Sequence, residues 1–150
     1  MAATTAIIKN YEEGNNLDVS SVPDALVLYN PVLDTGSDRM GEDWTIISPN
    51  HHIRAALPPA IVFHGTADKG VPYATAVSFQ KLMTENGNLC VLMTSVGKGH
   101  SFFNGHYFLE RNDNTYLNKT LYESHFFLNE IGILDNLPRE WIEGVPESIR

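Results

Sequence analysis

The chain has 150 residues, of which 43% are hydrophobic and 19% are charged, and its formal net charge is −8. This length and composition suit one globular domain with a buried core, and they exclude intrinsic disorder. The acidic balance, without any cluster of lysine and arginine, argues against binding to nucleic acid or to an anionic membrane surface. No apolar run approaches the ~20 residues of a membrane-spanning helix, and the single cysteine, Cys90, excludes an internal disulfide.

The first part of the chain predicts a helix, a strand and two loops. Residues 1–9 are predicted to form a short helix, and the polar segment 11–23 is predicted to form a loop. The apolar run ALVLYNP, residues 25–31, predicts a strand that is buried on both faces and closed by Asn-Pro. Residues 34–43 are rich in turn formers, and the Ser-Pro pair at 48–49 indicates the start of a helix.

The rest of the chain alternates strands with helices. The run AIVFHG, residues 60–65, predicts a second buried strand, and a helix is predicted for residues 72–87, between Pro72 and Gly87. LCVLMTSV, residues 89–96, predicts a third buried strand. A glycine-flanked loop follows at 97–106, and residues 116–133 are predicted to form an amphipathic helix.

This alternation predicts an α/β fold, in which a mostly parallel sheet lies between two layers of helices in a three-layer α/β/α arrangement. In the helix 72–87, three apolar residues, Val77, Leu82 and Met83, are predicted to fall near one face. Cys90 lies within the apolar run LCVLM, so we expect it to be a buried packing residue rather than a reactive thiol.

Two residues at the carboxyl ends of predicted strands have side chains suited to catalysis. Asp68 follows the second strand and His100 follows the third, and parallel sheets gather their functional groups in these loops. A carboxylate that accepts from imidazole Nδ1–H fixes the tautomer and stabilises the imidazolium that forms when Nε2 takes a proton. Gly97 and Gly99 would let the loop turn sharply around His100. Taken alone, each of the two residues is more often structural.

In this context the chain resembles the carboxyl-terminal half of α/β-hydrolase esterases and lipases, particularly the branch related to hormone-sensitive lipase and small-ester acylhydrolases. The resemblance lies in SPNHHIRAALPPAIVFHGTADKGVPYATAVSFQKLM and GKGHSFFN, and it covers most of residues 1–130. In that family the aspartate of an HGT-x-D-x-x-VP segment is the triad acid, and the histidine of a GHGFFN-like segment is the triad base. The resemblance therefore assigns these roles to Asp68 and His100. Ser101 stands where glycine is commoner.

The resemblance also implies a nucleophilic serine, which this sequence lacks in the expected setting. In this fold the serine precedes the acid and the histidine, within a G-x-S-x-G elbow between a strand and a helix. Neither that elbow nor an HGGG-type oxyanion loop occurs here, and none of the nine serines has this context. Residues 2–10, AATTAIIKN, are similar to the helix that follows the elbow. We therefore expect residues 1–150 to be the carboxyl-terminal part of one α/β-hydrolase domain, without its nucleophile-bearing half.

The expected function is that of a carboxylic ester hydrolase fragment, which acts on a small ester when complete and needs no cofactor or metal. Two alternatives remain: part of a related serine peptidase, and a non-catalytic binding or assembly module. His51 and His52 are adjacent, so their side chains should point apart, and no third metal ligand is evident. His64 is expected to be a structural histidine near the site, and Phe102 and Phe103 are expected to pack their loop.

The run 25–30 is also a candidate pairing surface. In the intact fold it would lie beside the strand that leads into the nucleophile elbow, with Leu26 and Leu28 on one face and Val27 and Tyr29 on the other. Without that neighbour it becomes an open edge, and no lysine or internal proline blunts it. We expect the chain to associate through this edge, with a second copy of itself or with a separate amino-terminal half.

Overall fold

The computed structural model describes most of the chain, in four ranges: residues 2–9, 20–36, 44–105 and 114–135. Most of the predicted loop 11–23 and most of the turn segment 34–43 lie outside these ranges. His106, the last residue of the predicted loop 97–106, also lies outside them. The chain divides into two compact units, residues 1–100 and residues 101–150, and each is described by itself.

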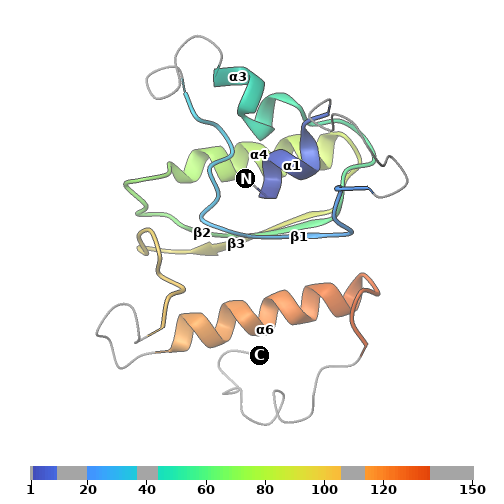
Figure 1. The fold of residues 1–150 in the computed structure, drawn as a ribbon. Coiled ribbons are helices and arrows are strands. Elements are labelled where there is room, and N and C mark those ends of the chain that lie inside the picture. The colour runs from blue at the N-terminus through green and yellow to red at the C-terminus, as the bar shows by residue number, and fades with distance from the viewer. Residues whose placement is uncertain (1, 10–19, 37–43, 106–113, 136–150) are drawn as a thin grey trace. The chain divides into compact units, whose positions relative to one another are not determined.

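The first unit is built on a sheet of three strands (Figure 1). The strands are parallel and lie in the order β1-β2-β3. The strands span Leu26–Tyr29, Ala60–Gly65 and Cys90–Ser95. In register, Leu26 of β1 lies opposite Ala60 of β2, which in turn lies opposite Cys90 of β3. Each strand falls within a run that the sequence predicted, so the predicted parallel α/β sheet is confirmed.

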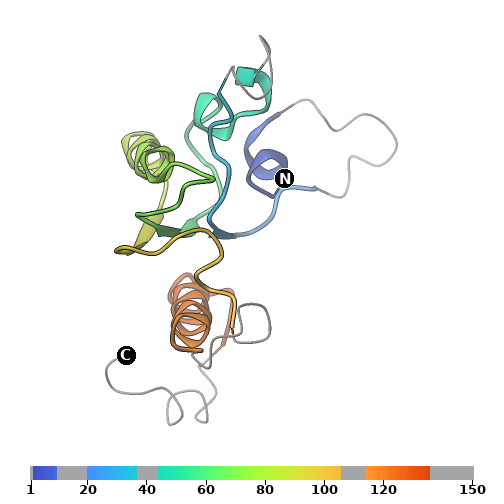
Figure 2. The same cartoon turned by 90° about the vertical axis from the view of Figure 1, so that its left-hand side faces the viewer.

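Helices α1 (Ala2–Ile7) and α4 (Tyr73–Glu85) pack on one face of this sheet (Figures 1 and 2). The 3-10 helix η1 (Pro49–His51) packs against both of these helices. The strand side chains that point into this core belong to alternate positions, such as Leu26, Leu28 and Val62. This alternation follows from the period of two in a strand.

The buried face of α4 differs from the predicted one. Ala76, Phe79 and Met83 are buried, with the spacing of one stripe along a helix, whereas Val77 is 42% exposed. Of the three residues predicted to fall near one face, Met83 is buried, Leu82 is half-buried and Val77 is exposed, so they do not share one face. Ala76, Phe79 and Met83 all belong to the core between α4 and the sheet, and Val77 lies off the stripe that they form.

Only the central strand is buried along its whole length. In β1, Leu26 and Leu28 are buried, while Val27 and Tyr29 are half-buried on the opposite face, where the Tyr29 ring stacks on Phe63 with centroids 5.0 Å apart. In β3 only Cys90 is buried. The prediction of three fully buried strands was therefore wrong for β1 and β3, since each has a strand neighbour on one side only among the described residues.

Cys90 is a packing residue, as predicted. Its side chain belongs to the core between the sheet and the helices, and burial raises the pKa of its thiol to about 12. A thiol with this pKa is protonated at neutral pH and is a poor nucleophile.

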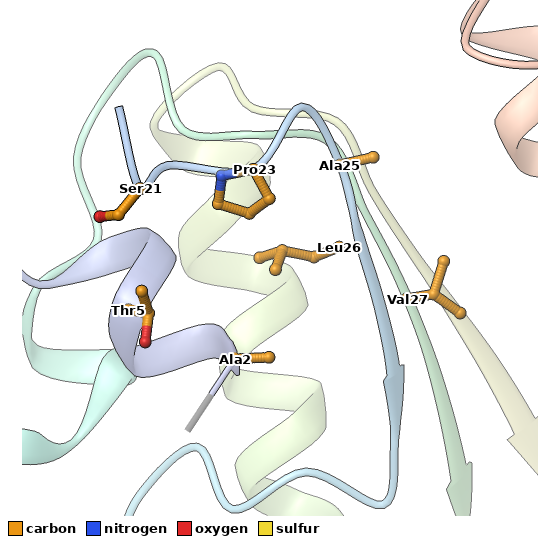
Figure 3. A pocket seen from close by; sticks show the side chains of 7 residues that line it. All are labelled: Ala2, Thr5, Ser21, Pro23, Ala25, Leu26 and Val27. Atoms are coloured by element: carbon orange, nitrogen blue, oxygen red, sulfur yellow. The ribbon is translucent and has the colours of Figure 1, made fainter. Parts of the chain in front are cut away.

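The outer edge of β1 borders an open pocket of about 370 Å³ (Figure 3). Its walls come from Ala2 and Thr5 of α1, from segment 21–25, and from Leu26 and Val27 of β1. The backbone N–H of Leu26 donates to Pro59 O (2.8 Å), just before β2, and that of Asn30 donates to Phe63 O of β2 (2.9 Å). Because N–H groups alternate in direction along a strand, the N–H of Val27 faces away from β2.

A short helix that the sequence did not predict, α3 (Trp44–Ile47), precedes η1. The Ser-Pro signal at 48–49 begins only the single 3-10 turn of η1. Ser48 does not cap that turn with its side chain; its Oγ instead donates to Trp44 O (2.8 Å) and accepts from Thr35 N (3.0 Å).

In the second unit, helix α6 (Thr115–Glu130) agrees with the prediction for residues 116–133. The Phe102 ring meets Phe103 and Tyr116 edge-on, with centroids 5.5 and 5.6 Å apart, so Phe102 and Phe103 pack their loop as predicted. None of the helices in the described ranges has both the length and the apolar character needed to span a bilayer.

Candidate active site

The loops that follow β2 and β3 are bonded to each other at the carboxyl edge of the sheet. Thr66 N donates to Ser95 O (3.1 Å), and Ala67 N donates to Lys98 O (2.9 Å). A third bond runs the other way, from Gly97 N to Thr66 Oγ1 (2.8 Å). These bonds hold the segment before Asp68 against the segment before His100.

Gly65, the last residue of β2, makes this close approach possible. A Cβ at this position would lie 2.2 Å from Lys98 O and 2.7 Å from Lys98 C, which are backbone atoms. A side chain would therefore push the two loops apart. Gly97 contributes the turn, because its φ of +71° lies in the left-handed region that favours glycine.

Asp68 and His100 meet between these loops. Asp68 Oδ2 lies 2.8 Å from His100 Nδ1, within hydrogen-bond distance, so the predicted contact between the two side chains is confirmed. The Asp68 side chain is fully buried, whereas that of His100 is 52% exposed. The pair thus has a buried carboxylate and an imidazole that is open to solvent.

The Asp68 carboxylate accepts four hydrogen bonds. Oδ1 accepts from two backbone groups of the following turn, Gly70 N (2.8 Å) and Val71 N (2.9 Å). Oδ2 accepts from His100 Nδ1 and from the side-chain amide of Asn30. Since a carboxylate oxygen has two lone pairs, all four acceptor positions of Asp68 are occupied.

These contacts determine the ionisation of Asp68. Burial alone would raise its pKa, but the hydrogen bonds from Val71, His100, Asn30 and Gly70 stabilise the charged form and lower the pKa from 3.8 to about 2. At neutral pH the carboxylate is ionised and can only accept. His100 Nδ1 therefore carries the proton in this bond, and in the neutral ring Nε2 is left as the acceptor.

Sequence reasoning missed Asn30. It follows β1 directly, is buried, and has a φ of +42°, a left-handed backbone that asparagine tolerates better than most residues. The available signal was the Asn-Pro pair at the end of an apolar strand, which indicates a turn and says nothing about Asp68.

His64 lies four residues before Asp68 in the chain, and Ser101 directly follows His100. His64 is fully buried, with Nδ1 3.1 Å from Gly65 O, and its ring meets Tyr73 edge-on, in agreement with a structural role. Ser101 has a φ of +64°. This is a conformation that favours glycine, and it gives a physical reason why glycine would be commoner at this position.

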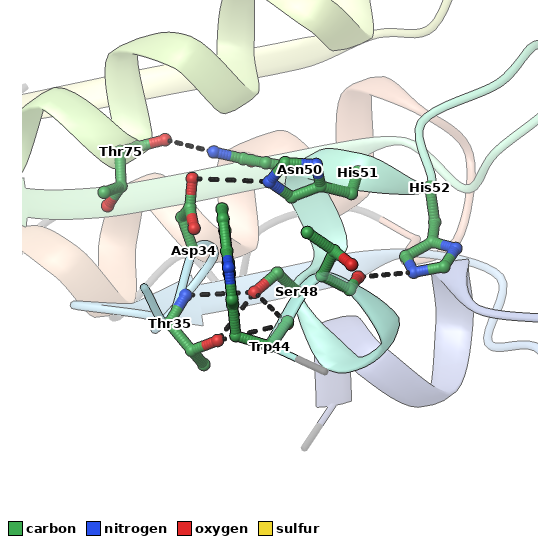
Figure 4. A network of polar contacts seen from close by, with 9 residues as sticks. Asp34, Thr35, Trp44, Ser48, Asn50, His51, His52 and Thr75 are labelled. Carbon is green, nitrogen blue, oxygen red and sulfur yellow. Dashed lines mark hydrogen bonds and ion pairs between the residues drawn. The ribbon is translucent and has the colours of Figure 1, made fainter. Parts of the chain in front are cut away.

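The segment 34–52 carries a separate polar network around Ser48 (Figure 4). His51 Nε2 lies 3.8 Å from Asp34 Oδ2, while His52 Nε2 lies 2.9 Å from Thr45 O, so the two adjacent imidazoles have different partners. No group of three or more potential metal ligands occurs in the part of the chain that the structure describes. His51 and His52 thus belong to this network and not to the Asp68 pair.

A second open pocket of about 370 Å³ links this network to the Asp68 turn. Its walls include Asp34, Trp44, Val71, Pro72 and Thr75. Val71 thus lines this pocket while its N–H holds Asp68.

Comparison with known proteins places this chain in a family. The model of the prolyl oligopeptidase family matches residues 20–132. Esterase 2 of the Planctomycetes species Thermogutta terrifontis, with propionate bound, is 38% identical over 91% of this chain and 53% of its own, with a TM-score of 0.79. The same esterase phosphorylated by paraoxon is 41% identical over 91% of this chain and 51% of its own, with a TM-score of 0.76. None of the curated proteins compared with the chain matches it.

This chain spans about half the length of these esterase structures. The family match covers β1, β2 and β3 together with the Asp68 and His100 loops. The parallel sheet and the structural neighbours confirm the predicted α/β-hydrolase fold. The chain belongs to the prolyl oligopeptidase family, within the α/β-hydrolase superfamily.

Proposed function

We propose that this chain supplies the acid and the base of a serine-dependent carboxylic ester hydrolase. The observation that carries the proposal is the 2.8 Å bond between buried, ionised Asp68 and half-exposed His100 at the carboxyl edge of a parallel sheet. The esterase structures, with 37–41% identity over about nine-tenths of the chain, support an ester over a peptide substrate. The name of the matching family is what favours the alternative, a related serine peptidase.

In this proposal His100 Nε2 accepts the proton of a serine hydroxyl as the serine oxygen attacks the ester carbonyl. The imidazolium that forms is stabilised by the Asp68 carboxylate, which keeps its negative charge throughout. His100 then returns the proton to the leaving alkoxide. The serine, and the backbone amides that would stabilise the oxyanion, come from outside residues 1–150, because no serine here has the elbow context.

A chimera tests this function. We expect activity when this chain replaces the segment that it matches in T. terrifontis esterase 2, with p-nitrophenyl butyrate as substrate, since that esterase has been captured with butyrate bound. The 150-residue chain alone serves as the control, and it should show neither turnover nor labelling of any serine by a fluorophosphonate. A chimera with native-like circular dichroism and thermal melting but no turnover would contradict the proposed roles, and would favour a non-catalytic binding or assembly module.

We also propose that the outer edge of β1 is a pairing surface, for a second copy of this chain or for a separate amino-terminal half. Three features support this proposal: the N–H of Val27 faces away from β2, most residues that line the neighbouring pocket are apolar, and residues 25–30 carry no charge. An uncharged edge of this kind is a template for another strand.

Val27→Pro probes the edge without touching the β1–β2 ladder. Proline removes an N–H that faces outward, and edge strands tolerate proline at such positions. For the self-pairing form we expect size-exclusion chromatography with light scattering to give a dimer for the wild type and a monomer for the variant, with little change in the thermal unfolding midpoint. A wild-type chain that is monomeric at high concentration would contradict self-pairing. The separate amino-terminal half would then be the remaining partner for the edge, and mixing the two chains would test it.

A further inference from the structure

Asn30 lies at the end of β1, and its backbone conformation determines where its side chain points. Its backbone N–H donates to Phe63 O (2.9 Å), which is the last contact between β1 and β2 before the chain turns. The left-handed φ of +42° then directs the side chain toward Asp68 instead of continuing the strand. Asn30 thereby ties the end of β1 to the acid that follows β2.

The orientation of the Asn30 amide follows from chemistry. Asp68 is ionised and can only accept, so the Nδ2 edge must face it and Oδ1 must point away. Oδ1 is buried and has no hydrogen-bond partner among the described residues. An amide left half unsatisfied in the interior is unfavourable, which indicates that the contact with Asp68 determines this orientation.

The contact also restricts His100. Gly70 N and Val71 N occupy both acceptor positions of Asp68 Oδ1, so the carboxylate cannot rotate without losing them. Oδ2 has two acceptor positions, of which Asn30 takes one and His100 takes the other. Without Asn30, the imidazole could approach from either direction, or water could take the vacated position.

We propose that Asn30 is a positioning residue, which fixes the direction from which the His100 imidazole approaches Asp68 by occupying the other acceptor position of Oδ2. An effect of Asn30 on catalysis rests on the proposed function, in which His100 is the base and Asp68 is the acid. The arrangement itself can be tested in the 150-residue chain, where no turnover is required.

Two variants and one control separate positioning from simple stability. Asn30→Gly removes the amide and tolerates the left-handed backbone, whereas Asn30→Asp keeps the shape of the side chain but sets a carboxylate against a carboxylate. Asn88→Asp is the control matched in charge. In the wild type the Asn88 side chain accepts from Leu57 N (2.9 Å) and donates to Arg54 O (2.7 Å). Asn88 lies just before the amino end of β3, at the opposite end of the sheet from Asp68.

Nuclear magnetic resonance of the Asp68 carboxyl carbon and of the His100 ring nitrogens provides the readout. We expect the pKa of Asp68 to rise by about one unit in Asn30→Gly and further in Asn30→Asp, where like charges disfavour ionisation. At neutral pH the signal of the His100 Nδ1 proton should broaden in Asn30→Gly as the ring samples two directions. Asn88→Asp should change neither signal, even if it lowers the melting temperature.

The proposal is overturned if a folded Asn30→Gly chain keeps the wild-type pKa of Asp68 and a sharp His100 Nδ1 signal. If Asn30→Gly fails to fold, Asn30→Asp decides alone, since an Asp68 pKa unchanged beside a new carboxylate would be incompatible with the contact. An inactive chimera with normal titration of Asp68 would contradict the proposed function and leave the positioning role intact.

Discussion

Replacing His100 by alanine in the chimera with T. terrifontis esterase 2 is expected to lower kcat for p-nitrophenyl butyrate by at least about a thousandfold. Alanine leaves no group to accept the serine proton, and it leaves the buried Asp68 carboxylate without its imidazole partner. KM should change little, because His100 acts on charge that develops in the transition state and not on the bound ester. Initial rates over a range of ester concentrations give both constants.

His51→Ala is the matched control for this loss. His51 is an exposed histidine of the same unit, 3.8 Å from Asp34 Oδ2, and it belongs to the network around Ser48. We expect its removal to change kcat by no more than a few-fold. Comparable losses in the two variants would mean that the effect comes from folding, and a chimera that keeps its rate without His100 would show that the base has been misassigned.

Much of the fold follows from local sequence patterns. The three strands were predictable because each is a continuous apolar run bounded by turn formers, and that pattern does not depend on the rest of the chain. Asp68 and His100 were predictable as a pair because each follows such a strand, and parallel neighbours bring their carboxyl-end loops together. The resemblance to α/β-hydrolases added the proposed roles of acid and base.

The features that the sequence did not predict depend on three-dimensional packing. Ala76 is buried and Val77 is exposed because the way α4 sits on the sheet determines which stripe of the helix is covered. Helix α3 has four residues and is too short for any periodicity to indicate it. Asn30 lies far from Asp68 along the chain, so its left-handed turn and its amide contact become visible only when β1 and β2 are paired.

Replacing Asp68 by asparagine in the 150-residue chain is expected to change how stability depends on pH. The folded-state pKa of Asp68 is lowered from 3.8 to about 2. Its ionised form therefore contributes stability that is fully present above the unfolded-state value and is lost as the pH falls through about 2. A shift of this size corresponds to about 2 kcal/mol in the free energy of unfolding. Asparagine at this position does not ionise and cannot make that contribution.

Urea unfolding of the two proteins at several pH values between about 7 and 2 measures this contribution directly. We expect the wild type to exceed Asp68→Asn in stability by an amount that narrows by about 2 kcal/mol as the pH falls from above 4 toward 2. Asp24→Asn is the control, since Asp24 is exposed, and its stability should follow the wild type throughout. A gap that stays constant down to pH 2 would mean that the four hydrogen bonds do not favour the carboxylate over the acid. The assignment of the proton to His100 Nδ1 at neutral pH would stand even then, because a carboxyl with its ordinary pKa of 3.8 is already ionised there and can only accept.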